Sequence, residues 1–507
     1  MSLLYTAIGG GYEIGANCHL VQMGERNIVL DCGLRPHETG ARALADFDRL
    51  HGLTDGRIDA LVVSHAHRDH AGGLEAFRER YGDAPVYASE ATCELLPHAA
   101  AGWGEGAERT TGAMSARAFD EWFGIAEGIE ACLRPAGHVV GATSVTLRAG
   151  DESVLFCADV AVAAHRMIGG LQTPEDDGLD VMILGATGGD RAHDARRRME
   201  GRLVSDVAEV VQNGGCAVVV ADRFGRAQEV LLALRSSMMS GQTPRFPVRA
   251  APDVAAMCDA LGEMLPHLAD PLRRYVENSR RDLFWGDGGA AAPDVLPMLQ
   301  GPAHGWTDIG AACAVVAPTS GAASPLTEYA EAIAHDARSA IFVPDSGDED
   351  DLPEPLRAAL AEGWMPSPDG RLHTACRVQT YDVPMHADQP QLCAVVNTAG
   401  PAAVILTHGR PDAIQALRHK LSGARAVFTP MNGDTFDPLA PAPIPDPDAR
   451  APIVDIGDGD GPLVMRFSTD AMGRPEFRRH FQGYARIEAR FDGNRLTLRP
   501  TVEEDDD

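Results

Sequence analysis

The sequence has almost no lysine: Lys420 is the only one, and all other basic charge is carried by arginine. Its 44 basic residues are outnumbered by 73 acidic residues, which gives a formal net charge of −29. A chain with that charge repels polyanions at long range, which argues against a nonspecific coat on DNA. Any contact with nucleic acid must therefore be local.

Long hydrophobic runs and paired cysteines are missing as well. No apolar run approaches the ~18 residues of a membrane span, and the N-terminus has no basic region followed by a long apolar stretch. The ten cysteines are scattered singly, without a CxxC pair, as in proteins of a reducing compartment. We therefore expect no membrane span, no secretion and a cytoplasmic location.

The chain does contain a repeating strand-and-helix pattern. Its 507 residues exceed what one hydrophobic core supports, so we expect two or three domains. Short apolar runs that end in Gly, Asp or His, such as "SVLFCADV", "CAVVVADRFG" and "AAVILTHG", alternate with amphipathic stretches such as "PDAIQALRHKL". This alternation predicts an α/β fold with its chemically active residues at strand ends.

Four metal-binding side chains crowd one of these strand ends, in "VVSHAHRDHAGG". Residues 58–64 are predicted as a strand, so His65 and His67 at its tip point the same way. Asp69 and His70 then open the next helix. The turn therefore presents two imidazoles to one cation, and a carboxylate with an imidazole to a second. Such ligands suit zinc, and also manganese or iron.

Three further segments supply matching side chains in the same order along the chain. "NIVLDCG" carries Asp31, "RPAGHVVGATS" carries His138, and "LFCADV" carries Asp159. Together with the HxHxDH run at residues 65–70, they resemble the motifs of the metallo-β-lactamase superfamily. From residue 7 to residue 437 the chain resembles its β-CASP nuclease branch, which includes ribonuclease J and the endonuclease that processes pre-mRNA 3′ ends.

The resemblance implies a dinuclear metal site. One metal would be held by His65, His67, His138 and Asp159, and the other by Asp69, His70, Asp159 and His408. The implied cofactors are two Zn²⁺ ions, with Mn²⁺ as the alternative, bridged by Asp159. Asp31 would orient one of the ligating histidines.

An inserted cap domain makes the β-CASP assignment specific. "GDRAH" and "GRAQE" resemble the start of that cap and of one of its helices, and "YDVPMHADQPQL" resembles the segment that presents the proton donor, here His386. A histidine at His408 favours the RNA-processing members of the branch. The resemblance implies an αββα sandwich with an inserted α/β cap and a small C-terminal β element. The predicted boundaries are 1–189 for the first part of the sandwich, 190–385 for the cap, 386–437 for the return segment, 438–462 for a linker, and 463–507 for the β element and acidic tail.

One position departs from the family pattern. The branch has an acid at the end of the strand that follows Asp159, and this chain has Gly185 there. Asp190 is a candidate replacement, although it aligns better with the aspartate of "GDR". Without the acid, His386 loses a partner that would raise its pKa, so reduced activity is expected.

The sequence thus predicts a ribonuclease in which a hydroxide activated by two metals attacks the phosphodiester. Asp69, His386 and Asp31 are its predicted catalytic residues, and Arg226 and Arg191 its predicted phosphate-binding residues. Single-stranded RNA is the expected partner, with a homodimer or a protein complex as the expected assembly. Two alternatives stay open: a weak or inactive scaffold subunit of an RNA-processing complex, and a metallohydrolase acting on a small molecule.

Overall fold

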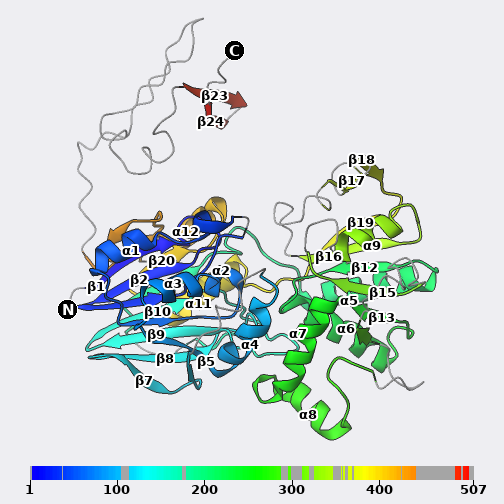
Figure 1. Ribbon diagram of the computed structural model, residues 1–507, viewed down its shortest axis with the longest axis horizontal. Helices are drawn as coiled ribbons and strands as arrows, with labels where there is room; N and C mark the ends of the chain where they lie inside the picture. Colours follow the sequence, from blue (N-terminus) through cyan, green and yellow to red (C-terminus); the bar gives the residue numbers. More distant parts are fainter. Residues whose placement is uncertain are drawn as a thin grey trace, which may run out of the picture. The chain divides into compact units, whose positions relative to one another are not determined.

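The chain divides into two compact units, Met1–Ala440 and Pro441–Asp507. The computed structural model (Figure 1) describes residues 3–36, 38–103, 114–173, 178–286, 295–297, 311–318, 325–345, 356, 358–359, 363–367, 370–423, 425–440, 486–492 and 495–501. Among these residues, no helix is both long enough and apolar enough to cross a bilayer. All ten cysteines are free thiols, as the scattered spacing predicts.

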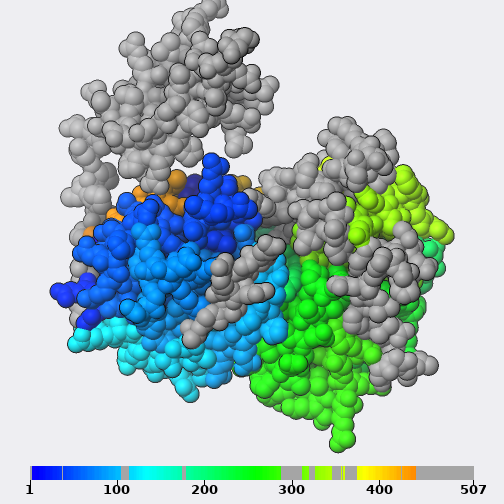
Figure 2. All heavy atoms as spheres, viewed as in Figure 1, coloured from blue at the N-terminus to red at the C-terminus, as the bar shows by residue number. Residues whose placement is uncertain are grey.

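Two seven-stranded sheets form the centre of the first unit. The first sheet has the order β22 (Thr435–Phe436), β1 (Leu3–Gly9), β2 (Cys18–Met23), β3 (Arg26–Leu30), β4 (Ala60–Val62), β5 (Val86–Ser89) and β6 (Ser115–Arg117). The second has the order β21 (Ala426–Phe428), β20 (Ala403–Thr407), β11 (Val181–Gly185), β10 (Glu152–Cys157), β9 (Thr143–Ala149), β8 (Ile129–Pro135) and β7 (Trp122–Ala126). Because β22 pairs with β1, the orange return segment lies beside the blue N-terminal residues (Figure 2).

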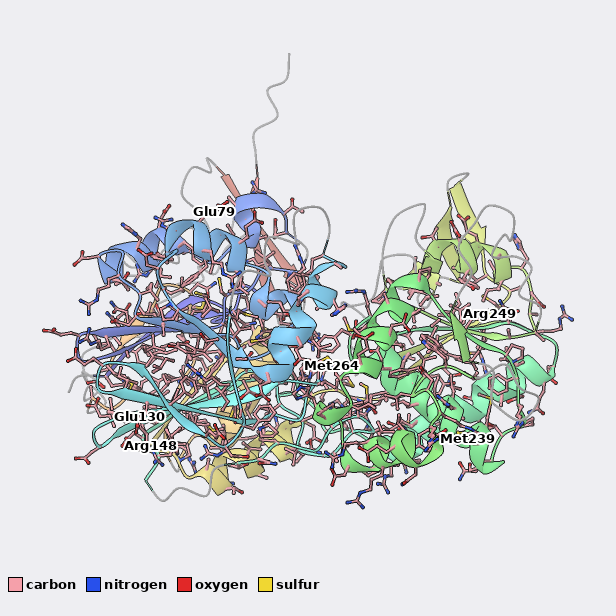
Figure 3. All side chains as sticks on the ribbon, turned by 60° about the horizontal axis from the view of Figure 1, so that its bottom comes forward. Glu79, Glu130, Arg148, Met239, Arg249 and Met264 are labelled. Atoms are coloured by element: carbon pink, nitrogen blue, oxygen red, sulfur yellow. The ribbon has the colours of Figure 1, made fainter. Side chains whose placement is uncertain are left out.

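One buried apolar cluster joins the facing sides of the two sheets. It includes Val21 and Leu30 from the first sheet and Leu147 and Ile183 from the second. The strands alternate between this core and the outer faces, as period-two patterning requires. On the second sheet, Glu130 and Arg148 are opposite each other on β8 and β9 as a cross-strand pair of opposite charge (Figure 3).

Helices cover the outer faces of both sheets and complete the predicted αββα sandwich. Those that accompany the first sheet are η1 (Gly40–Ala43), α1 (Phe47–Thr54), α2 (Arg68–Ala71), α3 (Leu74–Arg80) and α4 (Glu90–Ala100). Those that accompany the second are α11 (Gln389–Ala399) and α12 (Pro411–Leu421). The outer apolar residues Leu20 and Phe77, from β2 and α3, share a second buried cluster.

The cap is a separate sheet of six parallel strands. Its order is β14 (Val295–Pro297), β13 (Val248–Ala250), β15 (Cys313–Val316), β12 (Ala217–Val220), β16 (Ala340–Asp345) and β19 (Arg377–Asp382). Its helices are α5 (Arg196–Gln212), α6 (Arg226–Ser240), α7 (Pro252–Glu263), η3 (Leu265–His267), α8 (Asp270–Ser279) and α9 (Pro325–Ile333), and a short hairpin joins β17 (Trp364–Ser367) to β18 (Gly370–His373). Every residue of β12 is buried, as expected of a parallel strand covered on both faces.

The cap interrupts a single connection of the sandwich. The chain leaves after β11 and returns to β20, and these two strands are parallel neighbours in register, with Val181 opposite Ala403. The prediction of an inserted α/β domain is therefore confirmed. Its finer limits, at residues 189/190 and 385/386, stay predictions.

The second unit contains a hairpin, which is the predicted small C-terminal β element. β23 (Arg486–Asp492) pairs antiparallel with β24 (Arg495–Thr501) around the Asp-Gly-Asn sequence. The predicted linker from residue 441 onwards and the acidic end of the chain lie outside the described residues.

Candidate metal centre

The HxHxDH run forms a loop and one helical turn at the edge of the first sheet. β4 ends at Val62, so the strand is shorter than the predicted 58–64, and the chain reaches α2 through an irregular stretch. His67 is the N-cap residue of α2, with extended backbone angles, and its carbonyl accepts from the amide of His70. This sharp turn brings His65 Nε2 to 3.1 Å from His67 Nδ1.

The first predicted set of ligands is brought together by the fold. The ligand-type atoms of His65, His67, His138 and Asp159 all lie within 4.8 Å of one another. His138 comes from the turn between β8 and β9, and Asp159 follows the end of β10. His138 Nε2 lies 3.1 Å from His67 Nδ1 and 3.6 Å from Asp159 Oδ2.

The second predicted set is also assembled. Asp69, His70 and His408 form a second group within the same distance limit, and His408 arrives from the end of β20. Asp159 lies between the two groups: its Oδ2 is 3.4 Å from His70 Nε2, and its Oδ1 is 3.3 Å from His408 Nε2. A carboxylate in this position is able to bridge two cations.

The buried charges of the cluster fit a bound cation. Burial lowers the pKa of both His65 and His138, so these imidazoles are neutral. Burial works in the opposite direction on Asp159, but His408 and His386 outweigh it and hold the carboxyl pKa well below its usual range. Among the described residues, Asp159 Oδ1 has no hydrogen-bond partner. Neutral imidazoles around an ionised and unsatisfied carboxylate are the protonation states that metal binding requires.

His70 differs from the other two histidines. Burial alone would lower its pKa, but the charges of Asp69, Asp159 and Asp31 together raise it well above the ordinary value. Its Nδ1 lies 2.7 Å from Asp31 Oδ2. Asp31, in a left-handed conformation with φ 61°, also accepts from the amide and the hydroxyl of Ser64. This geometry supports the orienting role that the family resemblance implied for Asp31.

Asn17 is a site residue that the sequence did not indicate. Its Nδ2 lies 2.9 Å from His408 Nδ1 and 3.3 Å from His70 Nε2, and it donates to the backbone carbonyl of Asp69 at 3.1 Å. It therefore contacts all three members of the second group. The segment "EIGANC" belongs to the family resemblance, but an amide outside any ligand spacing carries no signal of its own.

His386 lies against the first group. Its ring contacts that of His138 in a tilted arrangement, with centroids 4.5 Å apart and an interplanar angle of 33°, and its Nδ1 is 3.8 Å from Asp159 Oδ1. Burial lowers the pKa of His386 to about 4, and the charge of Asp159 offsets this only in part. We expected His386 to lack a partner that raises its pKa, because the family's acid is missing at Gly185. The lowered pKa of His386 agrees in direction with that expectation.

The space beside Gly185 is closed. A Cβ on Gly185 would lie 2.1 Å from the carbonyl oxygen of Ala158, so no side chain fits without a backbone shift. Asp190 does not replace the missing acid, because its carboxylate is bound by Arg191 and Arg410, at 2.8 and 3.0 Å. These cations also lower the pKa of Asp190 against the opposing effect of burial.

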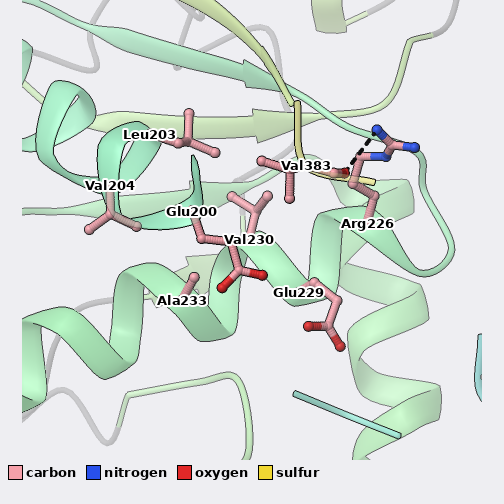
Figure 4. Close-up of a pocket in the computed structure, with 8 residues that line it drawn as sticks. All are labelled: Glu200, Leu203, Val204, Arg226, Glu229, Val230, Ala233 and Val383. Carbon is pink, nitrogen blue, oxygen red and sulfur yellow. Dashed lines mark hydrogen bonds between the residues drawn. The ribbon is translucent and has the colours of Figure 1, made fainter. Parts of the chain in front are cut away.

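The two predicted phosphate-binding arginines have different surroundings. Arg226 is 6% exposed, and its guanidinium donates to the carbonyls of Pro344 and Val383 beside a small pocket in the cap (Figure 4). These contacts give Arg226 a structural role, and phosphate binding by it stays a prediction. Arg191 pairs with Asp190, which also binds Arg410, and Arg410 pairs in addition with Asp412.

Comparison with known proteins agrees with this geometry. Residues 11–199 match the metallo-beta-lactamase superfamily, and residues 371–430 match the Zn-dependent metallo-hydrolase RNA specificity domain. An uncharacterized protein of Synechocystis is 26% identical over 87% of this chain and 76% of its own length. Cleavage and polyadenylation specificity factor subunit 3-I of Arabidopsis thaliana is 24% identical over 86% of this chain and 64% of its own. An RNase J-like protein of Methanocaldococcus jannaschii is 28% identical over 47% of this chain and 56% of its own.

The chain therefore spans less than two thirds of the length of the last two relatives. A crystal structure of a protein of unknown function from Enterococcus faecalis V583 shares the fold, with a TM-score of 0.52 at 14% identity, over 86% of this chain and 100% of that chain.

The loops at the strand ends of the sandwich bring His and Asp side chains together, and the cap is inserted in one crossover. This arrangement defines a metal-binding hydrolase fold with a cap domain. The family models and the relatives support the metallo-β-lactamase superfamily, in its β-CASP nuclease branch, as the family of this chain.

Proposed function

We propose that this protein is a metal-dependent ribonuclease that hydrolyses phosphodiester bonds of single-stranded RNA. The observation that carries the proposal is the position of Asp159 between the two groups of ligand-type residues, one supplied before the cap and the other completed by His408 after it. The site therefore exists only when both parts of the sandwich are assembled. Two zinc ions are the proposed cofactors, with manganese as the alternative.

The protein's own groups have separate tasks in this reaction. The two cations, when bound, would acidify a water and offset negative charge on the phosphoryl oxygens. Asp69, whose side chain is 23% exposed, would orient the attacking water from the open side of the site. Asp31 would keep the His70 ring in place. As the phosphorus–oxygen bond breaks, His386 would protonate the departing 3′ oxygen.

RNA is the proposed substrate for two reasons. Residues 371–430 match an RNA specificity domain, and two of the relatives are named for RNA cleavage or for cleavage and polyadenylation. Arg410, two residues after His408, shares Asp190 with Arg191 and also pairs with Asp412, and we propose that a backbone phosphate contacts these guanidinium groups. Such local basic side chains are needed because the chain as a whole is strongly acidic.

A second candidate is a scaffold subunit that binds metal but cleaves RNA slowly or not at all. The closed space at Gly185 favours it, because His386 then has no carboxylate partner other than Asp159 among the described residues. Two relatives are named as subunits of the Integrator complex. For either function, we propose assembly into a homodimer or a protein complex and residence in the cytoplasm.

The deciding experiment uses the purified full-length protein. Metal content is measured by mass spectrometry, and cleavage is followed with a 5′-labelled single-stranded RNA. Asp159→Ala should abolish both bound metal and cleavage. The matched control is Asp151→Ala, an exposed aspartate just before β10. If Asp159→Ala still cleaves RNA, the proposal of a metal-dependent ribonuclease is wrong. If the wild type binds metal but does not cleave RNA, the protein is the scaffold subunit instead.

A further inference from the structure

Two chain segments connect the sandwich to the cap, and a histidine in one segment forms hydrogen bonds to the other. His193 lies in the outgoing segment, and its ring Nδ1 is 2.7 Å from Asp382 Oδ1 in the returning segment. Its backbone amide donates to Asp388 Oδ2 at 3.0 Å, further along that returning segment. The neighbouring amide of Asp194 donates to Asp382 Oδ2 at 2.9 Å. His193 thus fixes both ends of residues 382–388.

The stretch between those two aspartates carries atoms of the candidate site. It presents the His386 side chain, and the carbonyl of Met385 accepts from His138 Nδ1 at 3.0 Å. The amide of Ala387 donates to the carbonyl of Val160, next to Asp159, at 2.7 Å. A displacement of this stretch would therefore move the proton donor and one predicted metal ligand together.

We propose that His193 is a positioning residue that holds His386 and, through Met385, His138 in register with Asp159. The inference deepens the proposed ribonuclease function and rests on it for the role of His386. A carboxylate accepts only, so the His193 ring donates from Nδ1 to Asp382. Asp382 in turn is fixed by the Asp194 amide, which leaves it little freedom to move.

The surroundings of His193 agree with a positioning role that depends on its hydrogen bond to Asp382. Its side chain is 6% exposed, and among the described residues its Nε2 has no hydrogen-bond partner. The ring therefore acts through Nδ1 alone. An asparagine would place its amide nitrogen near the position of Nδ1, whereas a glutamine would place it near that of Nε2. Substitution by these two residues separates the bond from the bulk of the side chain.

The first test, run with zinc in excess so that the metal sites stay filled, compares two substrates that differ in their leaving group. In RNA cleavage, water adds to phosphorus, the bond to the 3′ oxygen breaks, and that oxygen takes a proton from His386. In uridine 5′-(p-nitrophenyl phosphate), p-nitrophenolate leaves without a proton. A general acid contributes about 10²–10⁴-fold, so a misplaced one should slow RNA cleavage within that range and the activated ester far less.

His193→Gln and His193→Ala should therefore lower kcat for RNA strongly and kcat for the ester weakly, which is also the result expected of His386→Ala. His193→Asn should remain close to the wild type on both substrates. Thermal melting of each variant identifies any loss of folding. Equal losses on both substrates, or a His193→Gln variant that behaves as the wild type, would overturn the positioning role.

The second test does not depend on catalysis. Because Met385 orients His138, His193→Gln should weaken zinc binding by about tenfold relative to His193→Asn, as seen when a ligand loses its supporting hydrogen bond. Competition with a chromophoric chelator measures this. If the wild type binds zinc but cleaves no RNA, the ribonuclease fails while this comparison still decides the positioning role. Unchanged zinc affinity in His193→Gln, or a wild type that binds no zinc, would overturn it.

Discussion

The ring of His138 donates from Nδ1 to the carbonyl oxygen of Met385, 3.0 Å away and 247 residues distant in the sequence. Because a carbonyl oxygen accepts only, the proton of the neutral ring is on Nδ1, and Nε2 carries the lone pair. That lone pair faces Asp159 and His67. The returning segment thus selects the tautomer that a metal ligand needs.

Removing one ligand from each group should remove one metal at a time. We expect about two equivalents of zinc in the wild type, about one in His138→Ala or in His408→Ala, and almost none in Asp159→Ala, since a bridging carboxylate serves both ions. Elemental analysis after gel filtration gives the ratios. His98→Ala, an exposed histidine on α4, is the matched control. Loss of all metal in every histidine variant would contradict two separable groups.

Asn17 should support the second group only. Its amide contacts His70, His408 and the Asp69 carbonyl, so Asn17→Ala should weaken zinc binding at the second group by about tenfold, in the range seen for supporting residues of metal sites. Chelator competition with the two zinc equivalents resolved is the measurement. Gln22→Ala, on strand β2 just after Asn17, should leave both affinities unchanged. A uniform loss at both sites would argue for a general folding defect instead.

Introducing the family's acid at position 185 should destabilise the protein and should not raise its activity. A Cβ there would lie 2.1 Å from the Ala158 carbonyl, so even Gly185→Ala should cost about 1–3 kcal/mol, as overpacked sites do. Urea unfolding measures this loss. The control is Gly201→Ala in α5, where a Cβ meets no atom within 4 Å and helix propensity should add about 0.5–1 kcal/mol. A Gly185→Glu variant that is stable and more active would contradict the closed geometry.

The two predicted phosphate-binding arginines should respond differently. Arg226 is buried and holds the carbonyls of Pro344 and Val383, so Arg226→Ala should destabilise the fold by about 1–3 kcal/mol. Arg191→Ala should leave the melting temperature nearly unchanged, raise KM for RNA, and reduce the salt dependence of binding by about one phosphate contact. Thermal melting and binding titrations at several salt concentrations distinguish them. The reverse result would assign phosphate binding to Arg226.

Glu229 should make stability depend on pH in a defined direction. It is buried at the start of α6 and accepts from the amides of Arg166 and Met167, and burial raises its pKa despite the opposing charge of Arg196. A carboxyl whose pKa is raised on folding stabilises the protein fully below its unfolded pKa, and this contribution is lost as pH rises through the folded pKa.

Relative to Glu229→Gln, the wild type should therefore gain stability as pH falls from 7 toward 5. The other carboxyls are common to both proteins and cancel in this difference. Urea unfolding of both proteins across that range is the measurement. A difference that is flat, or that grows with rising pH, would contradict the raised pKa.

The local features of the candidate site could be predicted from the sequence. The HxHxDH run places His65 and His67 on one side of a turn, and the strand-end pattern places Asp159 and His408 at sheet edges. These follow from the two-residue period of a strand and from the order of strands and helices. The structure brings all of these residues into the two predicted groups.

Long-range support could not be predicted in the same way. Asn17 and His193 have no ligand spacing, and their roles depend on which residues lie opposite them after folding. The burial of Arg226 could not be predicted either, because the "GRAQE" match identifies the residue but says nothing about its exposure. A polar side chain near a motif has the same sequence signal whether it faces substrate or a backbone carbonyl.

The sequence by itself therefore determined the strand ends that carry these side chains and their order, because period and turn chemistry are local properties of the chain, and the family resemblance implied which of them are ligands. Only the tertiary structure decided that Gly185 leaves no room for a side chain, that Asp190 is committed to two arginines, and that Met385 sets the His138 tautomer. Those relationships depend on contacts between segments separated by the whole cap, and such contacts exist only once the sheets have packed.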